Sequence, residues 1–372
     1  MNHKFSSATF LAGLLVLCSS CGQPQNVAGD ASPGPALVVT DAAGRQVNLA
    51  RMPQRMSITG KASFMIENAV YLFPEARQKG LAFLGGQSLQ RPEAGDFLSL
   101  IVPDHAARAT LGGQAGIEEV AATRPDVVLM KSTVRQVGET MGQVGLPVVF
   151  LDLETPAQYE RDLAILGQLL GAPESAQTLM AYYRGILDDT ARRTASLSPA
   201  TQPRTLLIQS TERNGTAAFS VPAPEWIQTE LVERAGGMPV WKDSAQRSGW
   251  TVVNLEQIAA WDPEVVFVVN YHGNAARAVA AIRADSQWQA LRAIRTNRIY
   301  AFPGDFCSWD QPDPRWGLGL RWLGTRLHPD LFRDLNLVAE IIRFYALYGL
   351  SADSVREQIL PLLPEDVTHA AN

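Results

Sequence analysis

The chain has 372 residues, of which 46% are hydrophobic and 19% are charged, and its formal net charge is -5. This length and apolar content suffice for two hydrophobic cores of ordinary domain size. The low charge content and the acidic balance provide no basic field for a polyanion, so nucleic acid is not an expected partner.

The first residues are typical of a targeting segment. Residues 1–20 contain Lys4 and an apolar run from Ala8 to Leu17, which is too short to span a bilayer. We therefore expect a signal peptide over 1–20 and a polar tether over 21–36. The stretch ending at Cys21 resembles a bacterial lipobox, which implies a lipid on Cys21 and a protein anchored in the periplasm or at the cell surface. A plainly exported protein is the alternative. Because Cys307 is the only later cysteine, no disulfide is expected within the mature chain.

Strands and helices alternate from residue 37 onward. Residues 37–49 alternate apolar and polar side chains around a glycine turn, which indicates a hairpin. Strands are expected near 55–60, 81–86 and 147–152, with a long polar loop after the second. Helices are expected over 156–170 and about 174–196, and the second has an apolar stripe at helical spacing. A helix of roughly 23 residues is about 35 Å long, enough to bridge two lobes.

The second half has a similar plan. Strands are predicted over 204–209 and 298–302. Helices are predicted over 224–235, 316–327 and 331–348, and a further helix is expected to end at about residue 291. A stretch from the first half also recurs here: Ile117–Met130 aligns without a gap with Leu255–Val268. Each copy is typical of a helix that opens with an acid, a proline corner and a buried valine-rich strand. The repeat indicates a duplicated domain, although chance convergence of two helix-strand units gives the same pattern.

These observations predict an α/β protein with two Rossmann-like lobes, whose mostly parallel sheets are joined by one long connector helix. We expect an N-terminal lobe over 37–155, connector helices over 156–202, a C-terminal lobe over 203–362 and a tail over 363–372.

The Thr40-Asp-Ala-Ala-Gly-Arg45 opening, the paired Glu-x-x-Ala-x-x-x-Pro-acid motifs and the long helix resemble a known family. It comprises the TroA-like substrate-binding proteins of iron-siderophore, haem and cobalamin ABC importers. The resemblance implies a monomer that captures a ferric siderophore, haem or cobalamin between its lobes and delivers it to a permease dimer. It also implies that Glu118 and Glu256 bind the permease, with Glu119 as an alternative to Glu118. Molybdate or tungstate is the alternative ligand, and a bare metal ion is a weaker one.

The ligand of such a fold is expected between the lobes, at loops that follow strand ends. Trp250 and Trp309 are candidates for stacking on a planar chelate, and Arg247 for pairing with its carboxylates. Glycine-rich and hydroxyl-rich loops at 85–88 and 131–133 suit an oxyanion instead. The candidate ligand-binding residues are Lys61, Ser63, the 87–91 loop, Lys131 to Thr133, Arg213, Arg247, Trp250, Tyr271, His272, the run from Phe306 to Asp310 that includes Trp309, and Arg315.

Catalysis and direct metal binding are less favoured by the sequence. It contains no Gly-x-Ser-x-Gly elbow, no phosphate loop and no Gly-x-Gly-x-x-Gly fingerprint after a strand, so we expect a binding protein without a cofactor of its own. After the expected signal peptide, only His105, His272, His328 and His369 remain. Their positions do not favour a three-histidine metal site.

Overall fold

A computed structural model describes residues 37–78, 82–84, 97–102, 115–213, 216–272 and 274–368. The expected signal peptide, Cys21, the tether, the 85–91 loops, His105 and His369 lie outside these residues, as do the side-chain contacts of Arg213. Within the described part of the chain, no helix combines the length and apolar character needed to cross a membrane.

The N-terminal lobe is organised around a parallel four-stranded sheet in the order β4-β3-β5-β6, as predicted for an α/β lobe. A separate hairpin, β1-β2, precedes it. The elements are β1 (Leu37–Thr40), β2 (Gln46–Leu49), β3 (Arg55–Ile58), α1 (Ser63–Val70), α2 (Pro74–Gln78), β4 (Ala82–Leu84), α3 (Phe97–Ile101), α4 (Ile117–Ala122), β5 (Val127–Lys131), a 3-10 turn (Ser132–Val134), α5 (Arg135–Gln143) and β6 (Val148–Leu151).

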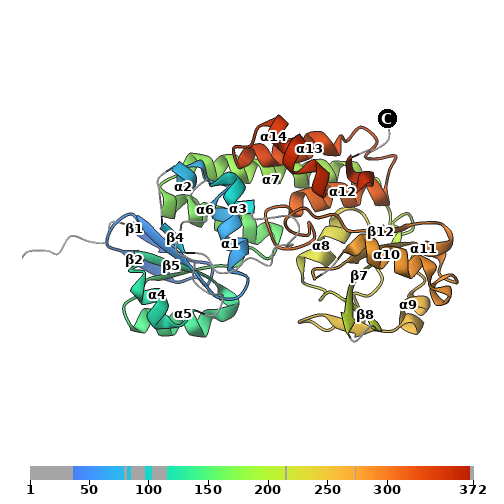
Figure 1. Cartoon of the computed structure of the whole chain (residues 1–372), viewed down its shortest axis with the longest axis horizontal. Coiled ribbons are helices and arrows are strands. Elements are labelled where there is room, and N and C mark those ends of the chain that lie inside the picture. Colours follow the sequence, from blue (N-terminus) through green and yellow to red (C-terminus); the bar gives the residue numbers. More distant parts are fainter. Residues whose placement is uncertain are drawn as a thin grey trace, which may run out of the picture. The chain divides into compact units, whose positions relative to one another are not determined.

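Strand β5 is apolar throughout because both faces of this sheet are covered. Val128 and Met130 pack with residues of α4 and α5, whereas Val127 and Leu129 join the main core on the other face. Figure 1 shows α4 and α5 on one side of the sheet and α1 on the other. The continuous valine-rich run therefore has the pattern expected of a buried parallel strand.

The predicted hairpin is present, and its turn is fastened to the sheet. Gly44 has a φ of 75°, which a glycine adopts without strain. The Asp41 carboxylate accepts hydrogen bonds from the backbone of Ala43 and Arg45 and from the Arg45 side chain, all at 2.7–3.0 Å. Arg45 also donates to the Val148 carbonyl and lies over the Phe150 ring. The Thr-Asp-Ala-Ala-Gly-Arg motif thus joins the hairpin to β6.

The C-terminal lobe has a mixed sheet in the order β10-β8-β7-β11-β12, with β9 paired to the start of β7. Strand β7 continues past the predicted end at residue 209 to Arg213, and it pairs with the antiparallel strand β8. The elements are β7 (Arg204–Arg213), β8 (Thr216–Val221), α8 (Ile227–Arg234), β9 (Met238–Pro239), β10 (Thr251–Val253), α9 (Leu255–Trp261), β11 (Val265–Val269), α10 (Ala275–Ala284), a 3-10 turn (Ser286–Trp288), α11 (Arg292–Arg295), β12 (Ile299–Ala301) and α12 (Trp316–Leu327).

The repeated motif forms the same unit in both lobes, α4-β5 and α9-β11. The residue after each helix turn, Arg124 or Asp262, has a positive φ of 51° or 40°. The acid of the proline corner then accepts a hydrogen bond from the first backbone N–H of the neighbouring strand: Asp126 from Arg55 and Glu264 from Arg204, each at 3.0 Å. Shared backbone geometry at equivalent positions supports duplication over chance convergence.

A long helix connects the lobes, as predicted. After α6 (Pro156–Leu170), helix α7 (Pro173–Thr194) buries Ala176, Leu179, Tyr183, Ile186 and Thr190 on one stripe. It packs against α6 at one end and against α8 and α12 of the C-terminal lobe. Tyr183 stacks on Trp316 of α12 with ring centroids 4.9 Å apart.

The C-terminal helices return to the N-terminal lobe. They are α13 (Leu337–Leu347), α14 (Ala352–Gln358), a 3-10 turn (Leu360–Leu362) and α15 (Glu365–Thr368). Tyr348, which follows α13, donates from its hydroxyl to the Asn68 carbonyl of α1 at 2.9 Å, and Arg77 donates to the Leu347 carbonyl. Figure 1 shows α13 and α14 beside α7 and α3.

Candidate functional site

Residues 303–315 form an irregular segment that joins the two lobes through buried polar contacts. Within it, Arg315 donates to Asp305 at 2.7 Å and to Asp313 at 2.8 Å, and all three side chains are fully buried. Asp305 also accepts from the Tyr345 hydroxyl at 2.5 Å, and Asp313 accepts from Asn68 of α1 at 2.6 Å. The 303–315 segment is therefore held from both lobes.

Trp309 and Arg315, two of the predicted ligand contacts, are buried and paired within the protein. Both side chains have no solvent exposure, and the Trp309 indole N–H donates to Asp305 at 3.0 Å. The Arg315 guanidinium lies over the Phe97 ring at 4.4 Å. These side chains stabilise the junction between the lobes, and none of their surface is open to a ligand.

Two of the predicted residues in the N-terminal lobe, Lys131 and Ser63, are also buried. Lys131, at the end of β5, is buried; its ammonium group donates to the Asp152 carbonyl and to Glu154, the latter at 2.8 Å. Ser63 is buried as the first residue of α1. The neighbouring Ser132 hydroxyl donates to Asp152. The Lys131–Thr133 loop is thus bound to carboxylates of its own lobe.

Three aromatic side chains of the C-terminal lobe form a partly exposed cluster, which we call the aromatic cluster: Trp226, Trp250 and Tyr271. Edge contacts join Trp226 to Trp250 at 5.6 Å and Trp250 to Tyr271 at 5.9 Å between ring centroids. Trp226 was missed by sequence analysis, because it directly precedes α8 and resembles a helix residue. Its position two residues after Pro224 is the local signal of a helix start.

Tyr271 links the aromatic cluster to the 303–315 segment. Its hydroxyl donates to Asp310 at 2.5 Å, and Asp310 accepts from Ser308 at 2.5 Å. Gln228 donates to the Tyr271 oxygen at 3.4 Å. Burial, and then the nearby Asp310 carboxylate, raise the pKa of Tyr271 well above its usual range, so the phenol stays protonated and keeps this orientation.

The same segment contacts the N-terminal lobe beside Lys61. Cys307 packs in a cluster with Phe64 and Met65 of α1, against which Ala62 also packs. Lys61 is exposed in the turn between β3 and α1. Residues 307–310 therefore contact α1 through Cys307 and the aromatic cluster through the hydrogen bond between Asp310 and Tyr271. Burial raises the pKa of the Cys307 thiol, which stays protonated and donates to Gln311.

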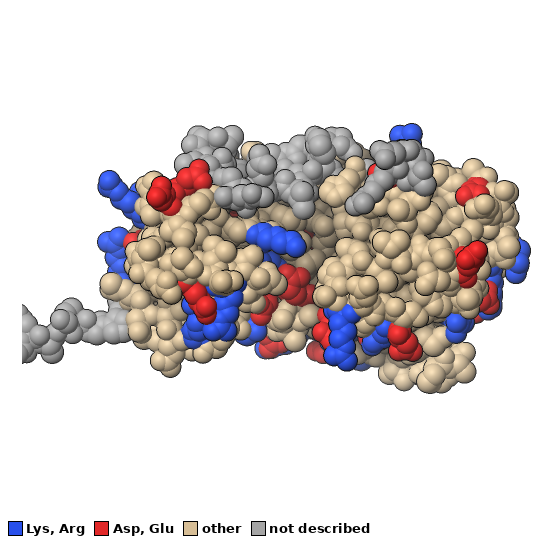
Figure 2. All heavy atoms as spheres, turned by 90° about the horizontal axis from the view of Figure 1, so that it is seen from below, with Lys and Arg blue, Asp and Glu red and all other residues tan. Residues whose placement is uncertain are grey.

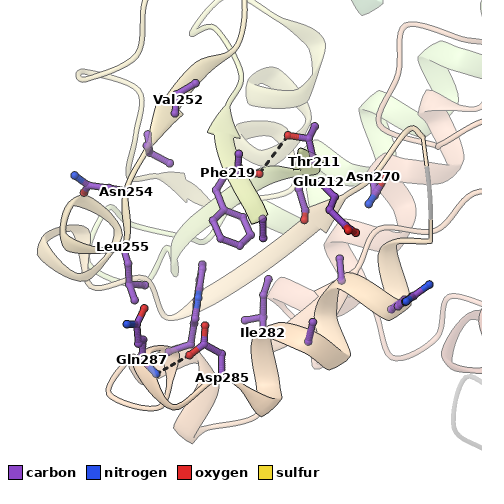
Figure 3. A pocket seen from close by; sticks show the side chains of 18 of the residues that line it. Thr211, Glu212, Phe219, Val252, Asn254, Leu255, Asn270, Ile282, Asp285 and Gln287 are labelled. Carbon is purple, nitrogen blue, oxygen red and sulfur yellow. Dashed lines mark hydrogen bonds between the residues drawn. The ribbon is translucent and has the colours of Figure 1, made fainter. Parts of the chain in front are cut away.

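The other predicted residues are exposed on the C-terminal lobe. Arg247 lies in the loop that leads to Trp250. His272 lines a groove of about 1030 Å³ formed by strands β7, β8 and β10 and helix α10. Figure 3 shows this groove, with Phe219 and Thr211 on the strands and Ile282 on the helix. His328 is half-buried between helices and contacts the Gly236 carbonyl at 3.0 Å. Among the described residues, no group of three or more His, Cys, Asp and Glu side chains is arranged to hold a metal ion.

Two neighbouring positions in each copy of the repeated motif have different roles. Glu119 accepts from the Gly116 backbone N–H at 2.9 Å, and Gln257, its counterpart, accepts from that of Asn254 at 3.0 Å. These side chains are capping groups. Glu118 and Glu256, one position earlier, are exposed at equivalent places on the two lobes. On the face seen in Figure 2, acidic and basic side chains are intermixed among neutral residues.

Comparison with known proteins identifies the family. A profile described as "Periplasmic binding protein" matches residues 90–306, more than half of the chain. This chain is a periplasmic binding protein. The family expected from the sequence is confirmed.

Several relatives share the fold of this periplasmic binding protein. The molybdate-binding protein MolA of Haemophilus influenzae is 28% identical over 116 residues, which span 31% of this chain and 32% of MolA. The structure of MolA bound to molybdate has a TM-score of 0.68 at 19% identity, covering 85% of this chain and 98% of MolA. A periplasmic solute binding protein from Veillonella parvula has a TM-score of 0.69 at 23% identity, covering 87% and 97%.

A siderophore-binding relative has the same fold. The triscatecholate siderophore binding protein FeuA from Bacillus subtilis, complexed with ferri-bacillibactin, has a TM-score of 0.57 at 15% identity, covering 79% of this chain and 99% of FeuA. These likenesses confirm the two-lobed α/β fold. The relatives are named for different ligands, molybdate and a ferric siderophore, so the fold alone does not select one.

Proposed function

We propose that this periplasmic binding protein captures a metal chelate of siderophore, haem or corrinoid type and delivers it, chemically unchanged, to an ABC permease. The ligand lies beside residues 307–310, between the Lys61 turn and the aromatic cluster. The observation that carries the proposal is the aromatic cluster, in which three large rings are partly exposed at the junction of the lobes.

The aromatic cluster has the properties that a broad ligand needs. Aromatic rings supply a large apolar area and few rotatable bonds, so little conformational entropy is lost when they order around a ligand. Tyr271 is already oriented by Asp310 and Gln228, which makes this wall rigid before binding. Lys61 and Arg247 supply positive charge for the carboxylates or catecholates of a chelate.

Molybdate is the second candidate, because the relative matched in sequence is named for it. Helix α1 has no side-chain cap at its N-terminus, and its first backbone N–H groups lie beside the exposed Lys61. Such a helix start attracts anions. Against this, the Lys131–Thr133 loop contacts Asp152 and Glu154, whose negative charges disfavour an oxyanion there.

Glu118 and Glu256 are proposed to bind basic residues of the permease. Both are exposed and belong to equivalent helices, whereas the adjacent Glu119 and Gln257 are used as caps. This geometry supports Glu118 rather than Glu119 as the proposed contact. Two acids, one on each lobe, suit two similar permease subunits.

The chain is further proposed to be a monomeric lipoprotein attached through Cys21 after removal of residues 1–20. Intact-mass measurement of the membrane-bound form tests this. We expect diacylglycerol on Cys21 and release of a Cys21→Ala variant into the soluble fraction. An unmodified mature protein contradicts the anchor and leaves the ligand proposal standing.

Calorimetric titration of the purified protein tests the ligand. The panel contains a triscatecholate ferric siderophore, haem, cobalamin and molybdate. We expect one chelate to bind at a single site per chain, without turnover. Tight binding of molybdate alone would replace the chelate with the oxyanion, and product formation would refute transport binding.

A further inference from the structure

The groove on the C-terminal lobe has none of the three aromatic-cluster rings among its lining residues. Its floor is the antiparallel pair β7-β8, one wall is α10, and the other is the turn from β10 into α9. Figure 3 shows Val252 and Leu255 on one side and Ile282 on the other, with Phe219 between them. Its volume of about 1030 Å³ is enough for several side chains of a partner.

The groove has apolar contact surface next to polar side chains. Val252 is 74% exposed, more than any other large hydrophobic residue in the described part of the chain. Strand β10 is at the edge of the sheet and pairs with β8 on one side. Asn254 and Asn270 line the groove as well. An exposed valine on an edge strand is unfavourable in water and suits a covered surface.

The groove is continuous with the place proposed to bind the permease. Leu255 lines it, and Glu256 is the next residue in the same helix. Glu212 and Asp285 also line it, against Arg277 and His272. Among the described residues, the N-terminal sheet has four strands and none that corresponds to β8 or β10.

From this continuity and charge balance we propose that the groove receives a short apolar segment of the permease, followed by a basic residue that pairs with Glu256. This inference rests on the proposed permease docking and deepens it. The C-terminal lobe contacts its permease subunit over a larger surface than the N-terminal lobe does. The repeated motif gives each lobe an acid, and strands β8 and β10 add the groove beside Glu256.

The test uses the full-length mature protein and the importer's own permease complex in nanodiscs. Binding is measured by interferometry for Val252→Asp and for the matched control Val38→Asp, which changes a valine that is 45% exposed on strand β1. We expect Val252→Asp to weaken permease binding by roughly tenfold or more, since a charge enters an apolar contact. Val38→Asp should bind normally, and ligand affinity should be unchanged in both.

A photo-crosslinking residue at position 252 then identifies the occupant. A crosslink to an apolar permease segment supports the proposal. A crosslink to a second copy of this chain would overturn the proposal that the groove binds the permease. So would normal permease binding by Val252→Asp when Glu256→Ala binds weakly. Either result would leave the proposed docking through Glu256 intact. Unchanged binding in Val252→Asp, Glu118→Ala and Glu256→Ala alike refutes both the groove and the docking on which it rests.

Discussion

Replacement of Arg315 by methionine is expected to destabilise the protein strongly without changing its ligand affinity. Methionine keeps most of the side-chain volume against Phe97 and removes the charge. The change deletes hydrogen bonds to Asp305 and Asp313 and leaves two fully buried carboxylates without their cation. Each charge-assisted hydrogen bond contributes roughly 1.5–3 kcal/mol. Breaking a buried ion pair from one side costs about 3–5 kcal/mol.

The free energy of unfolding from urea denaturation at pH 7 is therefore expected to fall by about 3–5 kcal/mol. Arg247→Met is the control, because Arg247 is exposed and its loss should change stability by less than about 0.5 kcal/mol. Ligand affinity of the folded Arg315→Met protein should match the wild type. A loss of stability below about 1 kcal/mol, or a large loss of ligand affinity at full stability, would refute the structural role assigned to Arg315.

Three further predictions concern the repeated motif and the junction between lobes. The double variant Glu118→Ala, Glu256→Ala should abolish uptake and leave ligand binding intact. The control Glu119→Ala should lower the free energy of unfolding by about 1 kcal/mol, because a helix cap is lost, and should leave uptake normal. Normal uptake in the double variant would contradict the docking role. Burial alone would raise the pKa of Asp126, but hydrogen bonds from Arg51, Gln54 and Arg55 outweigh it and lower that pKa. The stabilisation by the Asp126 carboxylate is thus present above the unfolded pKa of about 3.9, and it is lost as the pH falls through the lowered folded-state pKa. Asp126→Asn should therefore lower the free energy of unfolding at pH 7. In urea titrations at several pH values, the variant should lose less stability on acidification than the wild type. Gly319→Ala should lower the free energy of unfolding by about 1–3 kcal/mol or more in the same assay, because the added Cβ would lie 2.3 Å from the Trp309 carbonyl oxygen. Unchanged stability would show that the 303–315 segment can shift at little energetic cost.

The sequence correctly predicted those helices and strands in which the spacing of apolar residues matches the buried face. The stripe of α7 and the valine-rich strands β5 and β11 are such cases, because burial follows directly from spacing. The repeat also located Glu118 and Glu256 on equivalent helices. Strand β8 was missed because its Thr-Ala-Ala-Phe-Ser-Val sequence has weak strand propensity, and its pairing with β7 and β10 sets its structure.

The candidate site depended on contacts that spacing does not reveal. Trp309 and Arg315 follow a strand end, where ligand contacts are common, yet Asp305 and Asp313 direct them inward. The partners that complete this network, Asn68 and Tyr345, are far away in sequence. Lys131 was similarly predicted as a ligand contact, and the acid that pairs with it follows the next strand.

The aromatic cluster is tested most directly by titrating Trp250→Ala with the chelate that binds the wild-type protein. Trp261→Ala is the matched control, since Trp261 is also half-buried but precedes β11, at the opposite strand end from Tyr271. Loss of one stacked ring is expected to weaken binding by roughly tenfold or more, whereas the control should bind like the wild type. Equal affinities in wild type, Trp250→Ala and Trp261→Ala would contradict the proposal that the chelate lies on the aromatic cluster.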